Sequence, residues 1–298
     1  MILIAGATGV LGSAVARRLL ATGRAVRVLT REPTRAQALQ AAGAEVVKGD
    51  LRDPGSVRRA CEGATHVLTT ANAFTGRGAQ SVEAVDLEGT RHLIDAAREQ
   101  RVRQFVFTSA LLPREYYAID YFDAKRRNED RLRQSGVPFT ILKPTAFMET
   151  WARMILDGVV HKGVVLIFGS GQLPVNFVSV NDVAAVAAIV VDRPDALNAD
   201  VEIGGPENLT LLQVVDIVER VTGRRARRKH LPLALLKVMP TFVRPFNPVF
   251  ARAVQAGALM ASIPQPFDAS AMLARYPISP TRLEDWVRAT SASTSTAA

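Results

Sequence analysis

The stretch that decides the fold is residues 2–12, Ile2-Leu3-Ile4-Ala5-Gly6-Ala7-Thr8-Gly9-Val10-Leu11-Gly12. Its four leading apolar residues predict a short buried strand, and three glycines follow in the pattern G-x-x-G-x-x-G. Apolar residues then recur at helical spacing as far as Leu20. A glycine-rich turn between a buried strand and a helix is typical of the first βαβ unit of a dinucleotide-binding domain.

The three glycines have separate expected roles. We expect Gly6 to form the tight turn, Gly9 to let the backbone approach a pyrophosphate at the helix N-terminus, and Gly12 to let the helix pack closely on the strand. The expected contacts of this turn are Gly6, Thr8, Gly9, Val10, Leu11 and Gly12. The alternative is a tight strand-to-helix turn that binds nothing.

Downstream of this turn, apolar strand patterns alternate with helical patterns. The expected strands are residues 25–29, 45–47, 66–69, 105–107 and 139–142. The expected helices are residues 34–42, 54–62, 80–99 and 120–135. Strict β–α alternation with short links indicates right-handed crossovers and a parallel sheet with helices on both faces. The predicted fold class is therefore α/β, a doubly wound Rossmann sheet with a smaller C-terminal α/β cap lobe.

The alternation loosens after about residue 146, which predicts a change of domain. We expect residues 1–146 to form the dinucleotide-binding domain, with about 175–203 packing back onto it, and residues 147–288 to form a substrate-binding cap. Within the cap, Thr210 and Gln213 have the spacing of a helix capping box, and Gly223 is suited to end that helix. The Ser/Thr/Ala tail, residues 289–298, is expected to be disordered.

The end of the second strand indicates which dinucleotide the site would prefer. NAD-selective sites place an acid there, which binds the adenosine ribose. This chain has Thr30 and Arg31 instead. A guanidinium suits a 2′-phosphate, and Arg35 lies one helical turn further on. We therefore expect NADP(H), with Asp50 and Leu51 beside the adenine; the alternative is that Arg31 is a surface arginine.

Tyr121 and Lys125 are the candidate catalytic pair. Four residues apart on a predicted helix, they share one face. A tyrosine could protonate the alkoxide that hydride delivery creates, and a nearby ammonium would lower the tyrosine pKa. Ser109, or Thr108 beside it, could steady the substrate oxygen. The alternatives are that Lys125 pairs with a glutamate on the helix surface and that the tyrosine belongs to a packing or substrate wall.

Composition excludes several other classes of function. The 298 residues carry a net charge of +9, but 31 of the 37 basic residues are arginine, which indicates compositional bias. The densest basic run, Arg224–Lys229, lacks aromatic residues, so we expect a solvated loop and no nucleic-acid partner. The lone cysteine, Cys61, excludes an intramolecular disulfide and a metal site built from several cysteines. The four histidines are scattered without the spacing of metal ligands, so we expect no metal site. We see no apolar stretch long enough for a transmembrane helix and no targeting segment at the N-terminus, so we expect a cytoplasmic protein.

Several further segments resemble the short-chain dehydrogenase/reductase superfamily, in particular its atypical NmrA-like branch. The matching segments, beyond the glycine turn, are Asp86–Thr90, Phe105–Ser109, Tyr121–Lys125 with Glu129, Ser135–Pro144, Phe147–Glu149 and Gly204–Thr210. The likeness covers nearly all of residues 1–223 and weakens toward residue 288.

The resemblance implies an NADP-binding lobe with a C-terminal cap. By position it assigns Lys125 to the family's retained lysine and lines the cofactor trough with Thr70, Ala71 and Asn72. It puts Lys143, Pro144 and Phe147 near the nicotinamide. Relatives of this kind include reductases of quinones, dyes and phenylpropanoids, redox-sensing regulators, and a respiratory-complex subunit.

The sequence thus predicts an NADPH-dependent reductase of a small, largely apolar carbonyl, quinone or conjugated substrate, with a homodimer as the expected assembly. Phe147, Met148, Trp151 and the Leu231–Val243 region would shape the pocket, unless they are plain core residues. The alternative function is a noncatalytic NADP(H) sensor that acts through a protein partner. A third possibility is an assembly or scaffold protein.

Overall fold

The computed structural model describes residues 1–295 and divides into two compact units. The first unit comprises residues 1–111, 120–143 and 183–202, and the second comprises residues 112–119, 144–182 and the chain from 203 onward. Each unit has its own apolar core, and the two are described separately below.

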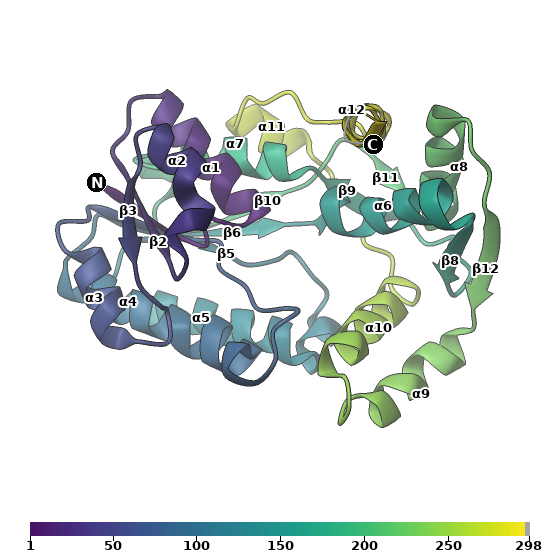
Figure 1. Ribbon diagram of the computed structural model, residues 1–298, viewed down its shortest axis with the longest axis horizontal. Helices are drawn as coiled ribbons and strands as arrows, with labels where there is room; N and C mark the ends of the chain where they lie inside the picture. Colours follow the sequence, from purple (N-terminus) through teal and green to yellow (C-terminus); the bar gives the residue numbers. More distant parts are fainter. Residues whose placement is uncertain (296–298) are drawn as a thin grey trace. The chain divides into compact units, whose positions relative to one another are not determined.

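A seven-stranded sheet forms the centre of the first unit (Figure 1). Its strands are β1 (Ile2–Ala5), β2 (Val26–Thr30), β3 (Glu45–Lys48), β4 (His66–Thr69), β5 (Gln104–Thr108), β6 (Phe139–Pro144) and β10 (Ala199–Ile203). The order is β3-β2-β1-β4-β5-β6-β10, and the first six strands pair in parallel. This is the doubly wound order, with its reversal between β1 and β4, so the predicted Rossmann architecture is confirmed.

Helices cover both faces of this sheet (Figure 1). They are α1 (Val10–Ala21), α2 (Gln37–Ala41), α3 (Pro54–Cys61), α4 (Thr90–Glu99), α5 (Asp120–Gln134) and α7 (Val180–Val190), with short 3₁₀ turns at Pro33–Ala36, Gly78–Gln80 and Pro194–Ala196. One core layer joins β1, β4, β5 and β6 to α3, α4 and α5. The strand residues that alternate with those of this layer, such as Ile4, Leu68 and Val106, are also buried and apolar, as burial of the sheet between two helical layers requires.

The predicted helix over residues 80–99 is not one α-helix. Residues Glu83–Gly89 wind as a π-helix before α4 begins at Thr90. A π turn inserts extra backbone per turn, and such turns often occur at functional sites. Here it carries the buried Asp86, whose carboxylate accepts a hydrogen bond from the backbone of Ala73.

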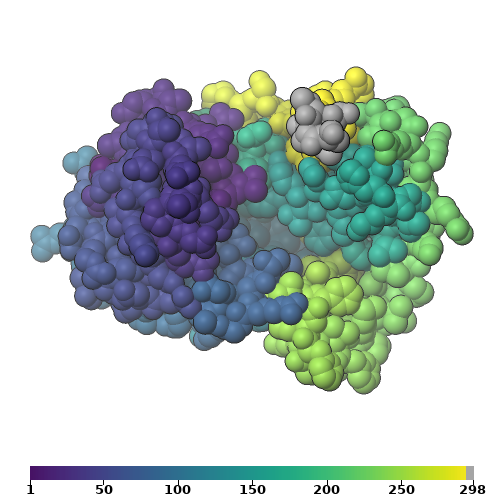
Figure 2. Space-filling view, viewed as in Figure 1, coloured from purple at the N-terminus to yellow at the C-terminus, as the bar shows by residue number. Residues whose placement is uncertain are grey.

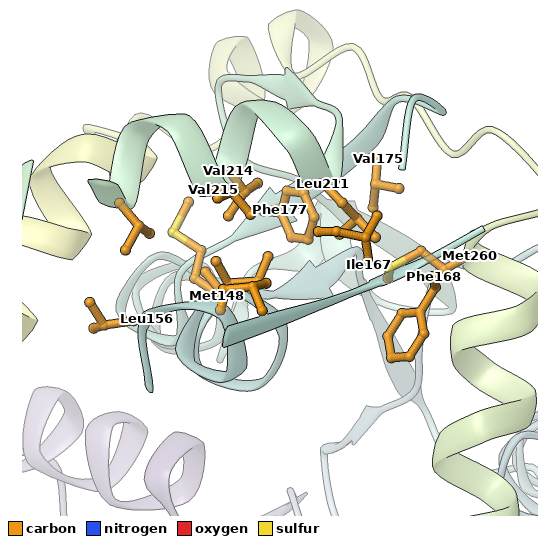
Figure 3. Close-up of a cluster of buried hydrophobic side chains, with 14 of the residues drawn as sticks. Met148, Leu156, Ile167, Phe168, Val175, Phe177, Leu211, Val214, Val215 and Met260 are labelled. Carbon is orange, nitrogen blue, oxygen red and sulfur yellow. The ribbon is translucent and has the colours of Figure 1, made fainter. Parts of the chain in front are cut away.

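The second unit is built from short strands and helices around a separate core. Its strands are β7 (Ala146–Phe147), β8 (Val164–Phe168), β9 (Val175–Val178), β11 (Asn208–Leu209) and β12 (Arg227–Leu231). Its helices are α6 (Met148–Asp157), α8 (Leu211–Thr222), α9 (Leu233–Val243), α10 (Pro248–Met260), α11 (Ser270–Arg275) and α12 (Leu283–Ser295), with a π turn at Gly158–Lys162 and a 3₁₀ turn at Arg114–Ala118. Met148, Phe177 and Val214 are among the side chains that pack together in this core (Figure 3).

Details of the second unit confirm one local prediction and correct others. Thr210 and Gln213 form the reciprocal capping box of α8, which ends at Gly223 in the left-handed conformation. Part of the basic run expected as a loop is instead strand β12. The tail prediction fails for residues 289–295, which continue α12, and its last three residues, 296–298, lie outside the described residues.

Within residues 1–295, none of the helices has the length and hydropathy that a bilayer crossing requires.

Candidate functional site

The glycine turn forms a cradle that side chains would fill. Gly6 has a φ of +87°, and a Cβ built on it would lie 2.6 Å from the backbone nitrogen of Ala71. A Cβ on Gly12 would lie 2.3 Å from the carbonyl oxygen of Gly6. Gly9 is the N-cap of α1 and donates its N–H to Gly6 O at 3.0 Å, and no side chain caps that helix. Backbone N–H groups at such a terminus attract anions.

A cleft of about 360 Å³ opens beside this turn in the first unit. It is lined by the glycine turn, the end of β2, the segment after β3 and residues 70–76 after β4. All these segments follow the carboxyl ends of parallel strands, where ligands bind in doubly wound folds. Ten of the predicted cofactor contacts line it: Gly6, Thr8, Gly9, Arg31, Arg35, Asp50, Leu51, Thr70, Ala71 and Asn72.

The other predicted cofactor contacts lie outside the lining of this cleft. They are Val10, Leu11, Gly12, Thr108, Lys125, Lys143, Pro144 and Phe147. Gly12 is buried beneath the turn, and the side chain of Val10 is 68% exposed on α1. Pro144 and Phe147 belong to the second unit.

The adenosine end of the cleft, as the sequence predicts it, carries charges of both signs. Arg31 donates to the side-chain oxygen of Gln80, and Arg35 lines the same wall. The carboxylate of Asp50 is bound by the guanidinium of Arg52, whose hydrogen bond holds the Asp50 pKa below its usual range. Arg31 and Arg35 are further cations of this wall, and the charge of Arg31 also lowers the Asp50 pKa.

Sequence reasoning missed two polar residues of this wall, Glu32 and Gln80. Glu32 could have been found, because it lies two residues beyond the end of β2. Gln80 could not, because its position depends on how residues 70–82 fold. Glu32 brings a carboxylate close to the predicted phosphate site, which opposes binding of a 2′-phosphate.

The candidate catalytic pair does meet on one face of α5, as its spacing predicts. The Nζ of Lys125 lies 5.0 Å from the centre of the Tyr121 ring and donates to the carbonyl oxygen of Thr108 at 2.8 Å. Lys125 is buried, which lowers its pKa, although the charges of Asp86 and Glu129 oppose that change.

The expectation that Lys125 lowers the Tyr121 pKa is wrong. Burial raises the pKa of Tyr121 well above its usual value, and the nearby charge of Asp86 raises it further. The half-buried ring packs edge-on against Phe74 and Phe122, with centres 5.1 and 5.0 Å away. The ammonium sits over the ring face and is bonded elsewhere, so it does not compensate for the lost hydration of a phenolate.

The hydroxyl predicted to steady a substrate oxygen is already engaged. Ser109 is 5% exposed, and its Oγ donates to Oε1 of Glu129. The other oxygen of Glu129 lies 3.1 Å from Nζ of Lys143, which also lies 2.6 Å from a carboxylate oxygen of Asp200. Lys143 is thus held in an ion-pair network rather than presented freely to a nicotinamide.

Thr108 differs from its neighbour Ser109. Its Oγ1 is buried, and within the described residues it has no hydrogen-bond partner. A buried hydroxyl without a partner costs free energy unless a ligand or water satisfies it. Of the two hydroxyls at the end of β5, Thr108 is therefore the one with unused hydrogen-bonding capacity.

The pocket-forming residues expected in the cap are largely core residues. Met148 is buried in the apolar cluster of the second unit, and Trp151 packs beside it with its ring 6.2 Å from that of Phe168. Glu149, which follows Met148 in the chain, is a residue that sequence reasoning did not single out as functional. Its carboxylate accepts hydrogen bonds from Val180 N and Trp286 Nε1, both at 3.0 Å.

The chain is similar to several known proteins in sequence and in fold. A reductase of (4-alkanoyl-5-oxo-2,5-dihydrofuran-3-yl)methyl phosphate from Streptomyces griseus is 34% identical over 78% of this chain and 77% of its own length. The photosystem II assembly factor Ycf39 of Trieres chinensis is 27% identical over 80% of this chain and 74% of its own. An NADPH-dependent quinone oxidoreductase from Escherichia coli superposes with a TM-score of 0.77 at 24% identity, covering 96% of this chain and 98% of its own.

The family model described as NmrA-like matches residues 1–281, which takes in the glycine turn, the Tyr121–Lys125 helix and nearly all of the second unit. The chain therefore belongs to the NmrA-like family.

Proposed function

We propose that this protein is an NADP(H)-dependent reductase of a small, largely apolar carbonyl, quinone or conjugated substrate. The observation that carries the proposal is the glycine cradle, where a Cβ at Gly6 or Gly12 would collide with backbone. That cradle opens on a cleft with two arginines at its far wall. The tight packing at Gly6 and Gly12 brings the backbone of the turn and the uncapped N-terminus of α1 to the edge of this cleft, an arrangement that fits a pyrophosphate.

In this proposal the residues that would hold the cofactor divide along the cleft. Gly9 and the first turn of α1 would bind the pyrophosphate, and Arg31 and Arg35 the 2′-phosphate. Thr108 and Lys125 lie outside the lining of this cleft and would hold the nicotinamide half beyond it, where the unpartnered hydroxyl of Thr108 fits a polar ligand group. When bound, NADPH supplies a hydride to the substrate.

Tyr121 would supply the proton. Its raised pKa keeps the hydroxyl protonated at neutral pH, and an alkoxide is a much stronger base than a phenolate. Donation to a newly formed alkoxide therefore stays favourable, whereas proton removal in the oxidative direction becomes harder. The environment of Tyr121 thus supports reduction rather than alcohol oxidation. A quinone needs this acid less, because hydride transfer to it leaves a hydroquinone anion that is stable enough to form without a proton donor and to take its proton from solvent afterwards.

The test is NADPH oxidation against a panel of aldehydes, ketones, enones, quinones and cationic dyes. Wild type is compared with Tyr121→Phe, and Tyr117→Phe is the matched control. We expect the Tyr121 variant to lose carbonyl reduction by about 10²–10⁴-fold, as removal of a general acid does, while quinone reduction changes little. Carbonyl turnover that survives in Tyr121→Phe would reassign the proton to water or another group.

The relatives favour the reductase reading but also support a second candidate. The Streptomyces relative and the Escherichia coli structure are named as reductases, whereas Ycf39 is named as an assembly factor. A noncatalytic NADP(H) sensor acting through a protein partner fits the engaged hydroxyl of Ser109. Nucleotide binding without turnover on any panel member would favour the sensor.

The variant Gly9→Asp distinguishes a scaffold protein that needs no nucleotide from the reductase and the sensor. The new carboxylate would stand at the pyrophosphate position and repel it. Partner binding that persists in this variant, after nucleotide binding is lost, would favour the scaffold over both other functions.

A further inference from the structure

Helices α9 and α10 pack against each other as a hairpin in the second unit, joined by residues 244–247 (Figure 1). The inner face of α9 carries Leu236 and Pro240, which are buried. Ala251 and Val254 are buried on α10. The hairpin is therefore anchored by one apolar face. Residues near 250, yellow-green in Figure 2, are visible at the surface of the second unit.

The opposite face of the hairpin is also apolar, yet it lies in solvent. The exposed fractions are 48% for Leu235, 55% for Val238, 71% for Phe242, 86% for Phe246 and 47% for Phe250. The first four follow one another at intervals of three, four and four residues, which aligns them along one side of α9 and its end. With about 200 Å² per aromatic side chain, the three phenylalanines alone expose roughly 400 Å². A patch of this size on a single chain is often functional.

The charge around this stripe has one sign. Residues 224–267 contain eight lysines and arginines and no aspartate or glutamate. Lys237 and Arg244 are exposed in the same stretch of sequence, Lys237 two residues after Leu235 and Arg244 two residues after Phe242. On neighbouring β12, Arg227 and Lys229 are exposed too, and Lys229 is in register with Leu166, which is 47% exposed.

Not every cation of this stretch contributes to the patch. Arg225 and Arg228 are paired with Glu219 of α8, and Arg252 is buried. These pairs cancel charge on the side of the sheet that faces α8. The exposed cations of α9 and its end, Lys237 and Arg244, have no acidic residue near them in the sequence.

We propose that the α9–α10 hairpin binds peripherally to an anionic lipid surface, with Phe242 and Phe246 in the interface and Lys237 and Arg244 on the headgroups. Aromatic and aliphatic side chains flanked by basic residues are the composition of elements that lie in such interfaces. A second copy of the chain fits this face less well, because it would bring the same positive charge against itself. The proposal does not depend on the reductase activity.

The first test places a fluorescent probe at the tip. Burial raises the pKa of the lone Cys61 to about 12, so this thiol is unreactive toward labelling at neutral pH. The exposed Pro245, next to Phe246, can therefore be changed in a Pro245→Cys variant and labelled selectively with an environment-sensitive dye in the full-length protein, while both phenylalanines stay in place. We expect a blue shift on vesicles containing phosphatidylglycerol and little change on pure phosphatidylcholine. The matched control is Leu197→Cys, an exposed apolar position of the first unit.

The second test is sedimentation with the same vesicles. Phe242→Ser and Phe246→Ser should each weaken binding by roughly tenfold, as expected for an aromatic side chain that leaves an apolar environment. Lys237→Gln and Arg244→Gln should each weaken it by roughly fivefold at low salt and less at high salt. Met154→Ser, which removes an exposed side chain from α6, should leave binding unchanged.

Three outcomes would overturn the proposal. One is the absence of sedimentation with anionic vesicles while the protein still binds NADPH. Another is binding that Phe246→Ser leaves intact. The third is a concentration-dependent dimer that Phe242→Ser and Phe246→Ser dissociate without lipid, which would assign this face to a second copy of the chain.

Discussion

Replacing Arg31 with alanine should weaken NADPH binding while leaving NADH binding nearly unchanged. Arg31 is exposed at the far wall of the cleft, and its guanidinium is bonded to the neutral amide of Gln80 rather than to a carboxylate. Its charge interacts with Asp50 through space and lowers the pKa of that carboxyl, but its hydrogen bond to Gln80 leaves the guanidinium unneutralised by a direct ion pair. NADPH and NADH differ only in the phosphate at the 2′ position, so the ratio of their affinities isolates the contact between Arg31 and this phosphate.

The magnitude follows from that setting. A hydrogen bond to a charged group contributes about 1.5–3 kcal/mol when sheltered, and exposure to solvent reduces this toward about 1–2 kcal/mol. The lost contact then corresponds to roughly 5–30-fold in the NADPH dissociation constant. Glu32 lies on the same wall and repels the phosphate, so Glu32→Gln should strengthen NADPH binding by a smaller factor.

The assay is titration of each nucleotide by fluorescence or calorimetry at low and high salt. The control is Arg17→Ala, which removes the same charge at an exposed position of α1. The NADPH effect should shrink as salt rises. An equal loss of NADPH and NADH affinity would refute the reasoning, because Arg31 would then support the cleft wall through Gln80. The variant Gln80→Ala separates the two roles.

Three further predictions follow from buried groups. Gly12→Ala should lower stability by about 2–3 kcal/mol in a denaturant titration and weaken nucleotide binding, because its Cβ meets the carbonyl oxygen of Gly6. Glu219→Gln should destabilise the fold by about 2 kcal/mol at pH 7, where Glu202→Gln changes little. Burial alone would raise the pKa of Glu219, but hydrogen bonds from the backbone and from arginines hold it below its usual value in the folded protein. The stabilisation that Glu219 gives is therefore fully present above the pKa of the unfolded state and is lost as the pH falls through the folded pKa. Cys61 should resist iodoacetamide at pH 8 and react only on unfolding, so rapid labelling of native protein would contradict its burial.

The first unit could be predicted from sequence because its signals are local. Short apolar runs and turn glycines determine where each strand ends, and the β–α alternation then leaves few topologies. The strand found at His66–Thr69 matches the predicted residues 66–69. The π turn at Glu83–Gly89 could not be predicted, because it depends on where Asp86 finds its partners in the folded protein.

Helical periodicity also has a limit that α9 makes plain. The helix has apolar residues on more than one side, since the buried Leu236 and the exposed Phe242 both belong to apolar sides. Which side meets the core depends on tertiary packing. The sequence therefore predicted that this region would shape a pocket, whereas the structure leaves Phe242 in solvent.

At the candidate catalytic pair, the spacing of Tyr121 and Lys125 correctly predicts that they are neighbours. Proximity alone does not determine a pKa, however, because hydration and every nearby charge also contribute. Asp86 acts on both groups: its charge raises the pKa of Tyr121 and opposes the fall in the pKa of Lys125. The same carboxylate holds the backbone of Ala73, in the loop that lines the cleft. Asp86 thus connects a loop that lines the nucleotide cleft with the charge environment of Tyr121, whose pKa is raised first by burial and then by this carboxylate.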